Sequence, residues 1–279
     1  MAVLITGASA GFGAAMARQF AAAGIAVIGA ARRSERLDEL KQQLGDLFHP
    51  LAMDVRSKES VDAALSSLAE APEAFRRIDC LINNAGLALD LSPAHQADFA
   101  DWENMIVTNI TGLAYLTRQV LPDMVARGEG YVINIGSIAG SYPYPGSNVY
   151  GATKAFVHQF SLNLRADLHG SGVRVSNIEP GLCGGTEFSQ VRFKGDQARA
   201  AAVYEGVQAL APEDVAAAAL WLYQTPKHVN VNYLEMMPVS QSFDRHPVYR
   251  PAPEPAAAED KQAAEPAPKR GFFSRLFGG

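Results

Sequence analysis

The chain has 279 residues, 48% of them hydrophobic and 19% charged, and a formal net charge of −5. These values predict one soluble globular domain with a large core, and the absence of a large basic block argues against nucleic-acid binding. No stretch approaches the roughly 18 apolar residues of a membrane span, and no signal peptide is visible. The two cysteines lack partner spacing. We therefore expect free thiols, a cytoplasmic location and no metal site.

Short, continuously apolar runs alternate with longer amphipathic patterns. Such runs are typical of strands buried on both faces, and strand–helix alternation predicts a parallel sheet with helices on both faces. The predicted strands are Val3–Thr6, Ala26–Ile28, Leu51–Met53, Cys80–Ile82, Tyr131–Ile135, Arg174–Ile178 and Leu234–Val239. The predicted helices are Gly13–Ala23, Arg36–Leu44, Lys58–Leu68, Asp101–Arg127, Tyr150–Leu168 and Pro212–Tyr223. The expected fold class is α/β, a doubly wound sheet of the Rossmann type.

A glycine-rich turn follows the first predicted strand. Gly7 permits a tight turn, Gly11 lets the backbone approach phosphates, and Gly13 lets the next helix pack closely on the strand. Its place between an apolar strand and an amphipathic helix predicts a dinucleotide site, whereas a plain strand–helix turn rarely needs three glycines. Ser9 and Phe12, in the same turn, are expected to contact the cofactor.

The end of the second strand distinguishes NAD from NADP. NAD sites place a carboxylate there for the ribose 2′-hydroxyl, but this chain has Arg32 and Arg33 and no acid until Glu35. Guanidinium groups bind phosphate through paired hydrogen bonds, so NADP is predicted. The alternative is that both arginines merely belong to the start of the next helix. Further cofactor contacts are predicted after the third and fourth strands, at Asp54, Val55, Asn83, Ala85 and Gly86.

Tyr150 and Lys154 are four residues apart, which places them on one face of a helix. An ammonium beside a phenol favours the phenolate, so we expect Tyr150 to exchange a proton well below the reference pKa of about 10. Together with the cofactor turn, this pair predicts an enzyme that oxidises an alcohol or reduces a carbonyl. The alternative to a catalytic site is that Tyr150 and Lys154 are merely exposed on a helix and that Ser137 belongs to a turn at the end of a strand.

These motifs occur in the order found in the short-chain dehydrogenase/reductase family, which the chain resembles over residues 1 to about 245. The resemblance implies that Tyr150 is the general acid and base, while Lys154 lowers its pKa and contacts the nicotinamide ribose. It implies that Ser137 hydrogen-bonds the substrate oxygen and that Asn109 supports a proton-relaying water. It also implies a homotetramer built on the long helices, and cofactor contacts from Pro180, Gly181 and Thr186.

Longer segments, including Asn148–Phe156 and Leu234–Val239, are similar to NADP-dependent 3-hydroxy acid dehydrogenases. This similarity implies a small charged substrate such as L-allo-threonine, serine, 3-hydroxypropionate or malonic semialdehyde. Arg192 and Lys194 lie in the segment expected to close over the substrate, and we predict that one of them binds its carboxylate. A solvated basic loop is the alternative for both residues. Glu187 is a candidate to contact a substrate amino group.

Two other functions remain open. One is a broad carbonyl reductase with a looser pocket, and the other is an NADP(H)-sensing protein that acts through its C-terminus. The retained residues Ser137, Tyr150, Lys154 and Asn109 argue against a purely regulatory role.

The composition changes near Pro247. We expect a folded domain over residues 1–247 and a disordered linker over 248–268, which is rich in Pro, Ala and Glu. Residues 269–279 interleave three phenylalanines and a leucine with three basic residues. This pattern is typical of a peptide that docks on a membrane surface or a partner protein, and an unused terminus is the alternative.

Overall fold

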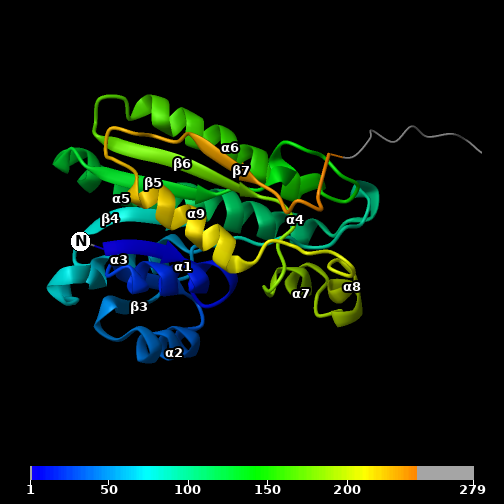
Figure 1. Ribbon diagram of the computed structural model, residues 1–279, viewed down its shortest axis with the longest axis horizontal. Coiled ribbons are helices and arrows are strands. Elements are labelled where there is room, and N and C mark those ends of the chain that lie inside the picture. The colour runs from blue at the N-terminus through cyan, green and yellow to red at the C-terminus, as the bar shows by residue number, and fades with distance from the viewer. Residues whose placement is uncertain (1, 244–279) are drawn as a thin grey trace, which may run out of the picture. The chain divides into compact units, whose positions relative to one another are not determined.

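Seven parallel strands form one sheet within residues 2–243, the part of the chain that this computed structural model describes (Figure 1). Their order across the sheet is β3-β2-β1-β4-β5-β6-β7. The predicted doubly wound α/β fold is confirmed. The strands are β1 (Ala2–Thr6), β2 (Ala26–Ala31), β3 (Phe48–Ala52), β4 (Ile78–Asn83), β5 (Gly130–Ile135), β6 (Val173–Pro180) and β7 (Tyr233–Met236).

Several strands extend beyond the apolar runs that predicted them. Strand β2 was expected to end at Ile28, but it continues through Gly29, Ala30 and Ala31 because these residues still pair with β3. Small side chains are required here, since a Cβ atom at Gly29 would collide with the ring of Phe48. Backbone pairing therefore extends these strands beyond their apolar centres.

Helices cover both faces of the sheet, as the apolar runs predict. Adjacent residues of β1 show the principle, because Ile5 packs in one hydrophobic cluster and Leu4 in the other. Helices α1 (Gly11–Ala22), α2 (Ser34–Leu44) and α9 (Pro212–Gln224) cover the Ile5 face. Helices α3 (Lys58–Ser67), α5 (Leu113–Arg127) and α6 (Asn148–Asp167) cover the Leu4 face. Among the described residues, no helix combines the length and apolarity needed to cross a bilayer.

The long helix predicted over Asp101–Arg127 is interrupted. It comprises α4 (Phe99–Ile106), a π-helical segment (Val107–Gly112) and α5. The start lies two residues earlier than predicted because the Asp98 side chain accepts a hydrogen bond from the Ala100 N–H and caps the helix. A π-helical turn is wider than an α-helical turn, and this one contains Asn109.

A buried chain of side-chain hydrogen bonds joins the middle of the sheet to two helices. Asn83 Nδ2 donates to Thr117 Oγ1 of α5 at 2.8 Å and to Asn134 Oδ1 of β5 at 2.9 Å. Asn134 Nδ2 donates to Ser161 Oγ of α6 at 2.8 Å. Buried amides need such partners, and their geometry fixes the two helices against β4 and β5.

Strands β1 and β4 are neighbours, although they lie far apart in sequence. The connections that follow them run to opposite sides of the sheet, which opens a crevice beyond their carboxyl ends. Helices α7 (Phe188–Arg192) and α8 (Gln197–Ala202) lie beyond this end of the sheet (Figure 1). The compact unit of the described chain is Met1–Phe243. The predicted linker and C-terminal peptide lie outside the described residues and stay predictions.

Candidate active site

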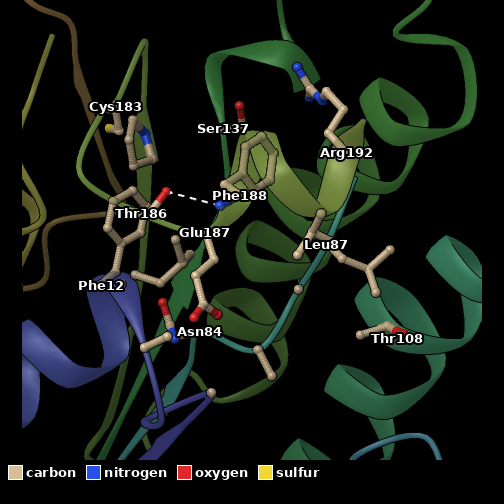
Figure 2. Close-up of a pocket in the computed structure, with 18 of the residues that line it drawn as sticks. Phe12, Asn84, Leu87, Thr108, Ser137, Cys183, Thr186, Glu187, Phe188 and Arg192 are labelled. Carbon is tan, nitrogen blue, oxygen red and sulfur yellow. Dashed lines mark hydrogen bonds between the residues drawn. The ribbon is translucent and has the colours of Figure 1, made fainter. Parts of the chain in front are cut away.

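A cavity of about 550 Å³ lies at the carboxyl ends of the strands. Its lining includes the glycine turn and Arg33 as well as Ser137, Tyr150 and Lys154, so the two motifs found far apart in sequence share one space. Figure 2 shows Ser137, Phe188 and Arg192 gathered on one side of this cavity, with Phe12 and Asn84 on the other. We call residues 182–204 the lid, because several of them line the cavity and they carry α7 and α8.

The glycine turn fits a dinucleotide. Gly7 and Gly11 adopt left-handed backbone angles, with φ of +67° and +51°, which other residues rarely adopt. A Cβ atom at Gly13 would collide with the carbonyl oxygen of Gly7, so the start of α1 packs directly on the turn. The N-cap residue Ala10 has no side chain able to accept from the first N–H groups of α1. These N–H groups form a typical phosphate-binding helix terminus.

Arg33 occupies the opposite end of the predicted cofactor site from Tyr150. Its Nε and Nη2 atoms donate to Ser9 Oγ at 3.2 and 3.1 Å. Its Nη2 atom also lies 2.9 Å from Oε2 of the lid residue Glu187. The structure therefore brings the predicted arginine and the predicted serine together, and it places a lid carboxylate on the same guanidinium group.

Asp54 and Val55 line the same end of the cavity, together with Arg32. Arg56 Nη2 lies 2.7 Å from Asp54 Oδ2, and this hydrogen bond lowers the pKa of the Asp54 carboxyl. Arg56 also lines the cavity but was not predicted. Three guanidinium groups at one end of the cavity favour a ligand that carries an additional phosphate there.

Ser137 follows β5, while Tyr150 and Lys154 belong to α6, and all three are buried. Lys154 Nζ donates to the Ile135 carbonyl at 2.8 Å and lies 5.9 Å from the centroid of the Tyr150 ring. The predicted cluster of hydroxyl, phenol and ammonium therefore forms.

Burial determines the proton affinities in this cluster. It raises the pKa of Tyr150 to about 12, although a hydrogen bond with Ser137 acts in the opposite direction. Burial also lowers the pKa of Lys154 to about 8. The expected lowering of the Tyr150 pKa is wrong, because desolvation opposes the phenolate and the Lys154 ammonium group is directed to the Ile135 carbonyl.

Asn109 does not line the cavity. Its Oδ1 atom accepts from the Leu87 N–H at 2.9 Å, and its Nδ2 atom donates to the Leu87 carbonyl at 2.8 Å and to Thr153 Oγ1 at 3.0 Å. It thus holds the loop after β4 against α6. The adjacent Thr108 faces the cavity instead, which the sequence did not indicate.

The lid places its two basic candidates differently. Arg192 Nη2 donates to Tyr144 Oη at 3.2 Å, and its guanidinium lies 5.2 Å from the centroid of the Tyr150 ring. Its Nε atom is buried without a hydrogen-bond partner among the described residues. Lys194 instead forms an ion pair with Asp101 at 2.7 Å and does not line the cavity. Of these two residues, only Arg192 lines the cavity.

Most predicted cofactor residues line the cavity, including Phe12, Ala85, Gly86 and the lid-side group Pro180, Gly181 and Thr186. Thr186 Oγ1 accepts from the Phe188 N–H at 3.2 Å (Figure 2). Gly13 and Asn83 do not line the cavity; Gly13 packs the turn, and the amide of Asn83 is used within the sheet. Besides Arg56 and Thr108, the lining residues that the sequence missed include Asn84, Leu87, Tyr144, Leu182, Cys183, Phe188 and Gln241.

A doubly wound parallel sheet, a glycine cradle and a Ser–Tyr–Lys cluster in one cavity define a dehydrogenase of the Rossmann type. The family model for short chain dehydrogenase matches residues 1–197, and the chain belongs to this family. The resemblance inferred from the motifs is confirmed.

Similar proteins cover nearly the whole described chain. A probable NADP-dependent dehydrogenase of Haemophilus influenzae is 60% identical over 240 residues, which are 86% of this chain and 94% of that protein. The NADP-dependent 3-hydroxy acid dehydrogenase of Escherichia coli K12 is 57% identical over 250 residues, 90% of this chain and 100% of that protein. A solved closed form of serine dehydrogenase complexed with NADP+ is 56% identical, covers 90% of this chain and 100% of its own, and has a TM-score of 0.87.

Proposed function

We propose that this chain is an NADP-dependent dehydrogenase of small 3-hydroxy acids, with serine, L-allo-threonine and 3-hydroxypropionate as candidate substrates. The observation that carries the proposal is Arg192, whose guanidinium lies beside Tyr150 and whose buried Nε atom has no hydrogen-bond partner within residues 2–243. A buried donor without a partner is costly, and a carboxylate is the group best suited to satisfy it. The names of the similar proteins from Escherichia coli agree with this substrate class.

The residues that would hold NADP line one continuous cavity. The glycine turn and the start of α1 would bind the pyrophosphate, and Arg32 and Arg33 the 2′-phosphate. Lys154, Gly181 and Thr186 would lie at the nicotinamide end. When bound, the cofactor supplies or accepts the hydride.

Tyr150 moves the proton in this proposal. Its pKa of about 12 keeps the phenol protonated at neutral pH, so it is ready to donate to a substrate carbonyl. In the opposite direction the phenol must first release its proton to solvent, and the phenolate then accepts the proton of the 3-hydroxyl group. Ser137 would hydrogen-bond the same substrate oxygen, and Arg192 would fix the carboxylate so that this oxygen faces Tyr150.

A substrate panel tests the proposal. The formation of NADPH would be followed with L-allo-threonine, L-serine, 3-hydroxypropionate and 2-propanol, each also offered with NAD⁺. We expect NADP⁺-dependent turnover of the three acids and little of 2-propanol. Turnover of 2-propanol alone would favour a general carbonyl reductase. NADPH binding without any turnover would favour the sensing protein.

Arg192→Ala separates the carboxylate role from general effects on the lid. Loss of a charged hydrogen bond is expected to raise the KM for the acids by roughly 10- to 100-fold. The KM for a neutral ketone in the reverse direction should change little. Lys194→Ala is the matched control, because Lys194 belongs to the same lid but pairs with Asp101 outside the cavity. Equal effects on acids and ketones would reject the role of Arg192.

A homotetramer and a cytoplasmic location belong to the same proposal. Both rest on the family resemblance, and sedimentation of the purified protein would test the assembly. Docking by residues 269–279 remains a separate proposal that rests on their composition alone.

A further inference from the structure

One lid residue reaches the cofactor end of the cavity rather than the substrate end. Glu187 Oε1 and Oε2 lie 3.3 and 2.9 Å from Nη1 and Nη2 of Arg33, a two-point pairing between carboxylate and guanidinium. The remaining donor, Nε, is directed to Ser9 Oγ. Figure 2 shows the Glu187 side chain directed toward Asn84 and away from Ser137 and Arg192. This position does not suit the predicted contact with a substrate amino group.

We propose that Glu187 is a specificity-determining residue that competes with the 2′-phosphate of the cofactor for Arg33. The inference rests on the proposed use of NADP. A phosphate group and a carboxylate are bound by the same donor fork of an arginine, and two anions on one fork repel each other. NADP(H) must therefore displace Glu187, whereas NAD(H), which has only a 2′-hydroxyl there, can leave the ion pair in place.

The position of Glu187 in the chain connects this exchange to the rest of the lid. The preceding residue, Thr186, lies over the glycine turn, since its methyl group is 3.3 Å from an ideal Cβ position at Gly11. The following residue, Phe188, packs on Tyr150 with ring centroids 5.8 Å apart. Release of Glu187 from Arg33 therefore acts on a segment that contacts both the cofactor turn and the catalytic tyrosine.

Glu187→Gln tests the competition by cofactor binding alone. Dissociation constants for NADPH and NADH would be measured by nucleotide fluorescence, without substrate. The ion pair is about half exposed, and such pairs typically contribute up to about 1 kcal/mol, so we expect NADPH to bind about two- to fivefold more tightly to the variant. NADH binding should stay unchanged. Glu205→Gln removes the same charge from an exposed residue next to the lid and should leave both constants unchanged.

A second experiment repeats the comparison in the variant Arg33→Ala. In this background Glu187→Gln should no longer alter NADPH binding, because the competing anions have lost their shared partner. Parallel changes for NADPH and NADH, unchanged NADPH affinity, or weaker NADPH binding in Glu187→Gln would each overturn the inference. If the unaltered protein binds NADH as tightly as NADPH, the proposed cofactor fails instead, so the two failures are distinguishable.

Discussion

Lys154 keeps an ammonium group in a buried position, where the Ile135 carbonyl accepts its hydrogen bond. Burial lowers the pKa of Lys154 from 10.5 to about 8, so the folded protein binds this proton less tightly than the unfolded chain does. Between pH 8 and pH 10.5 the unfolded chain carries more of this proton, and stability therefore rises with pH in that window. Below pH 8 the buried ammonium group lowers the free energy of unfolding by its full amount, about 3 kcal/mol.

Lys154→Met should therefore stabilise the protein while it removes turnover. After allowing about 1 kcal/mol for the hydrogen bond lost at Ile135, we expect the free energy of unfolding at pH 7 to rise by about 2 kcal/mol. The gain should shrink as the pH approaches 10.5. Urea denaturation at pH 7 and pH 10 would measure it, with exposed Lys58→Met as the control that changes little. A variant less stable than the unaltered protein at pH 7 would contradict this account of the buried ammonium.

Site residues could be predicted where local spacing fixes their relation, and could not where only the folded chain brings them together. Tyr150 and Lys154 were predictable because helical geometry fixes the relation between positions four apart. Arg192 and Lys194 were not separable, since two nearby lid residues take opposite surroundings only in the folded chain. Tyr144 and Gln241 reach the cavity from loops without a motif, so no local pattern identified them.

At the scale of elements, the contact between α1 and the glycine turn depends on one missing side chain. A Cβ atom at Gly13 would collide with the Gly7 carbonyl and would approach the Asn84 side chain to 2.8 Å. Gly13→Ala is therefore expected to push α1 away from β1. We expect a loss of about 2 kcal/mol in stability and weaker binding of NADPH, because the phosphate-binding N–H groups move with the helix.

Thermal unfolding and NADPH titration of Gly13→Ala would measure both effects. Arg18→Ala, an exposed change on the same helix, is the control and should alter neither. Unchanged NADPH affinity in Gly13→Ala would show that the turn accommodates a methyl group without moving the helix.

Elements with a strong periodic or apolar pattern were recovered from the sequence, and short elements were not. The seven predicted runs all overlap strands. The five inner strands are buried on both faces, which demands continuous apolarity, whereas the edge strands β3 and β7 are only partly buried. Helices α7 and α8 have only five and six residues, too few to show an amphipathic repeat. The π-helical turn before α5 keeps a helix-like sequence, so no local pattern identified it. In the folded chain its last residue, Gly112, lies close to the Val55 carbonyl, where a Cβ atom would collide.

For the whole molecule, every residue that lines the cavity belongs to the unit Met1–Phe243. The similarity to the Escherichia coli enzyme spans 250 residues and all of that protein. A chain that ends at Arg250 is therefore expected to keep its NADPH affinity, and its melting temperature should shift by less than about 2 °C. Scanning calorimetry with and without NADPH would compare the two chains. A markedly lower melting temperature would show that residues 251–279 stabilise the folded unit.

The fold and the cofactor end of the site follow from sequence because the glycine turn of a dinucleotide site directly follows the first strand, where a local pattern is visible. The pairing of Arg33 with Glu187 does not follow from sequence, since 153 intervening residues must fold before the two side chains meet. The high pKa of Tyr150 was also beyond reach, because it depends on how completely the folded protein excludes water from the phenol.

The buried hydrogen bonds between Thr117, Asn83, Asn134 and Ser161 have a consequence for how this sequence can drift over generations. Asn83 Nδ2 donates to Asn134 Oδ1, so an apolar residue at position 83 leaves the Asn134 oxygen without its donor, and one at position 134 leaves an Asn83 N–H without its acceptor. Either loss costs about 1–3 kcal/mol. Replacing both by apolar residues of matching size removes this cost, because no buried amide is then left without its hydrogen-bond partner. We therefore expect descendants of this chain to inherit the two asparagines together or to lose them together, even though neither touches the ligand cavity.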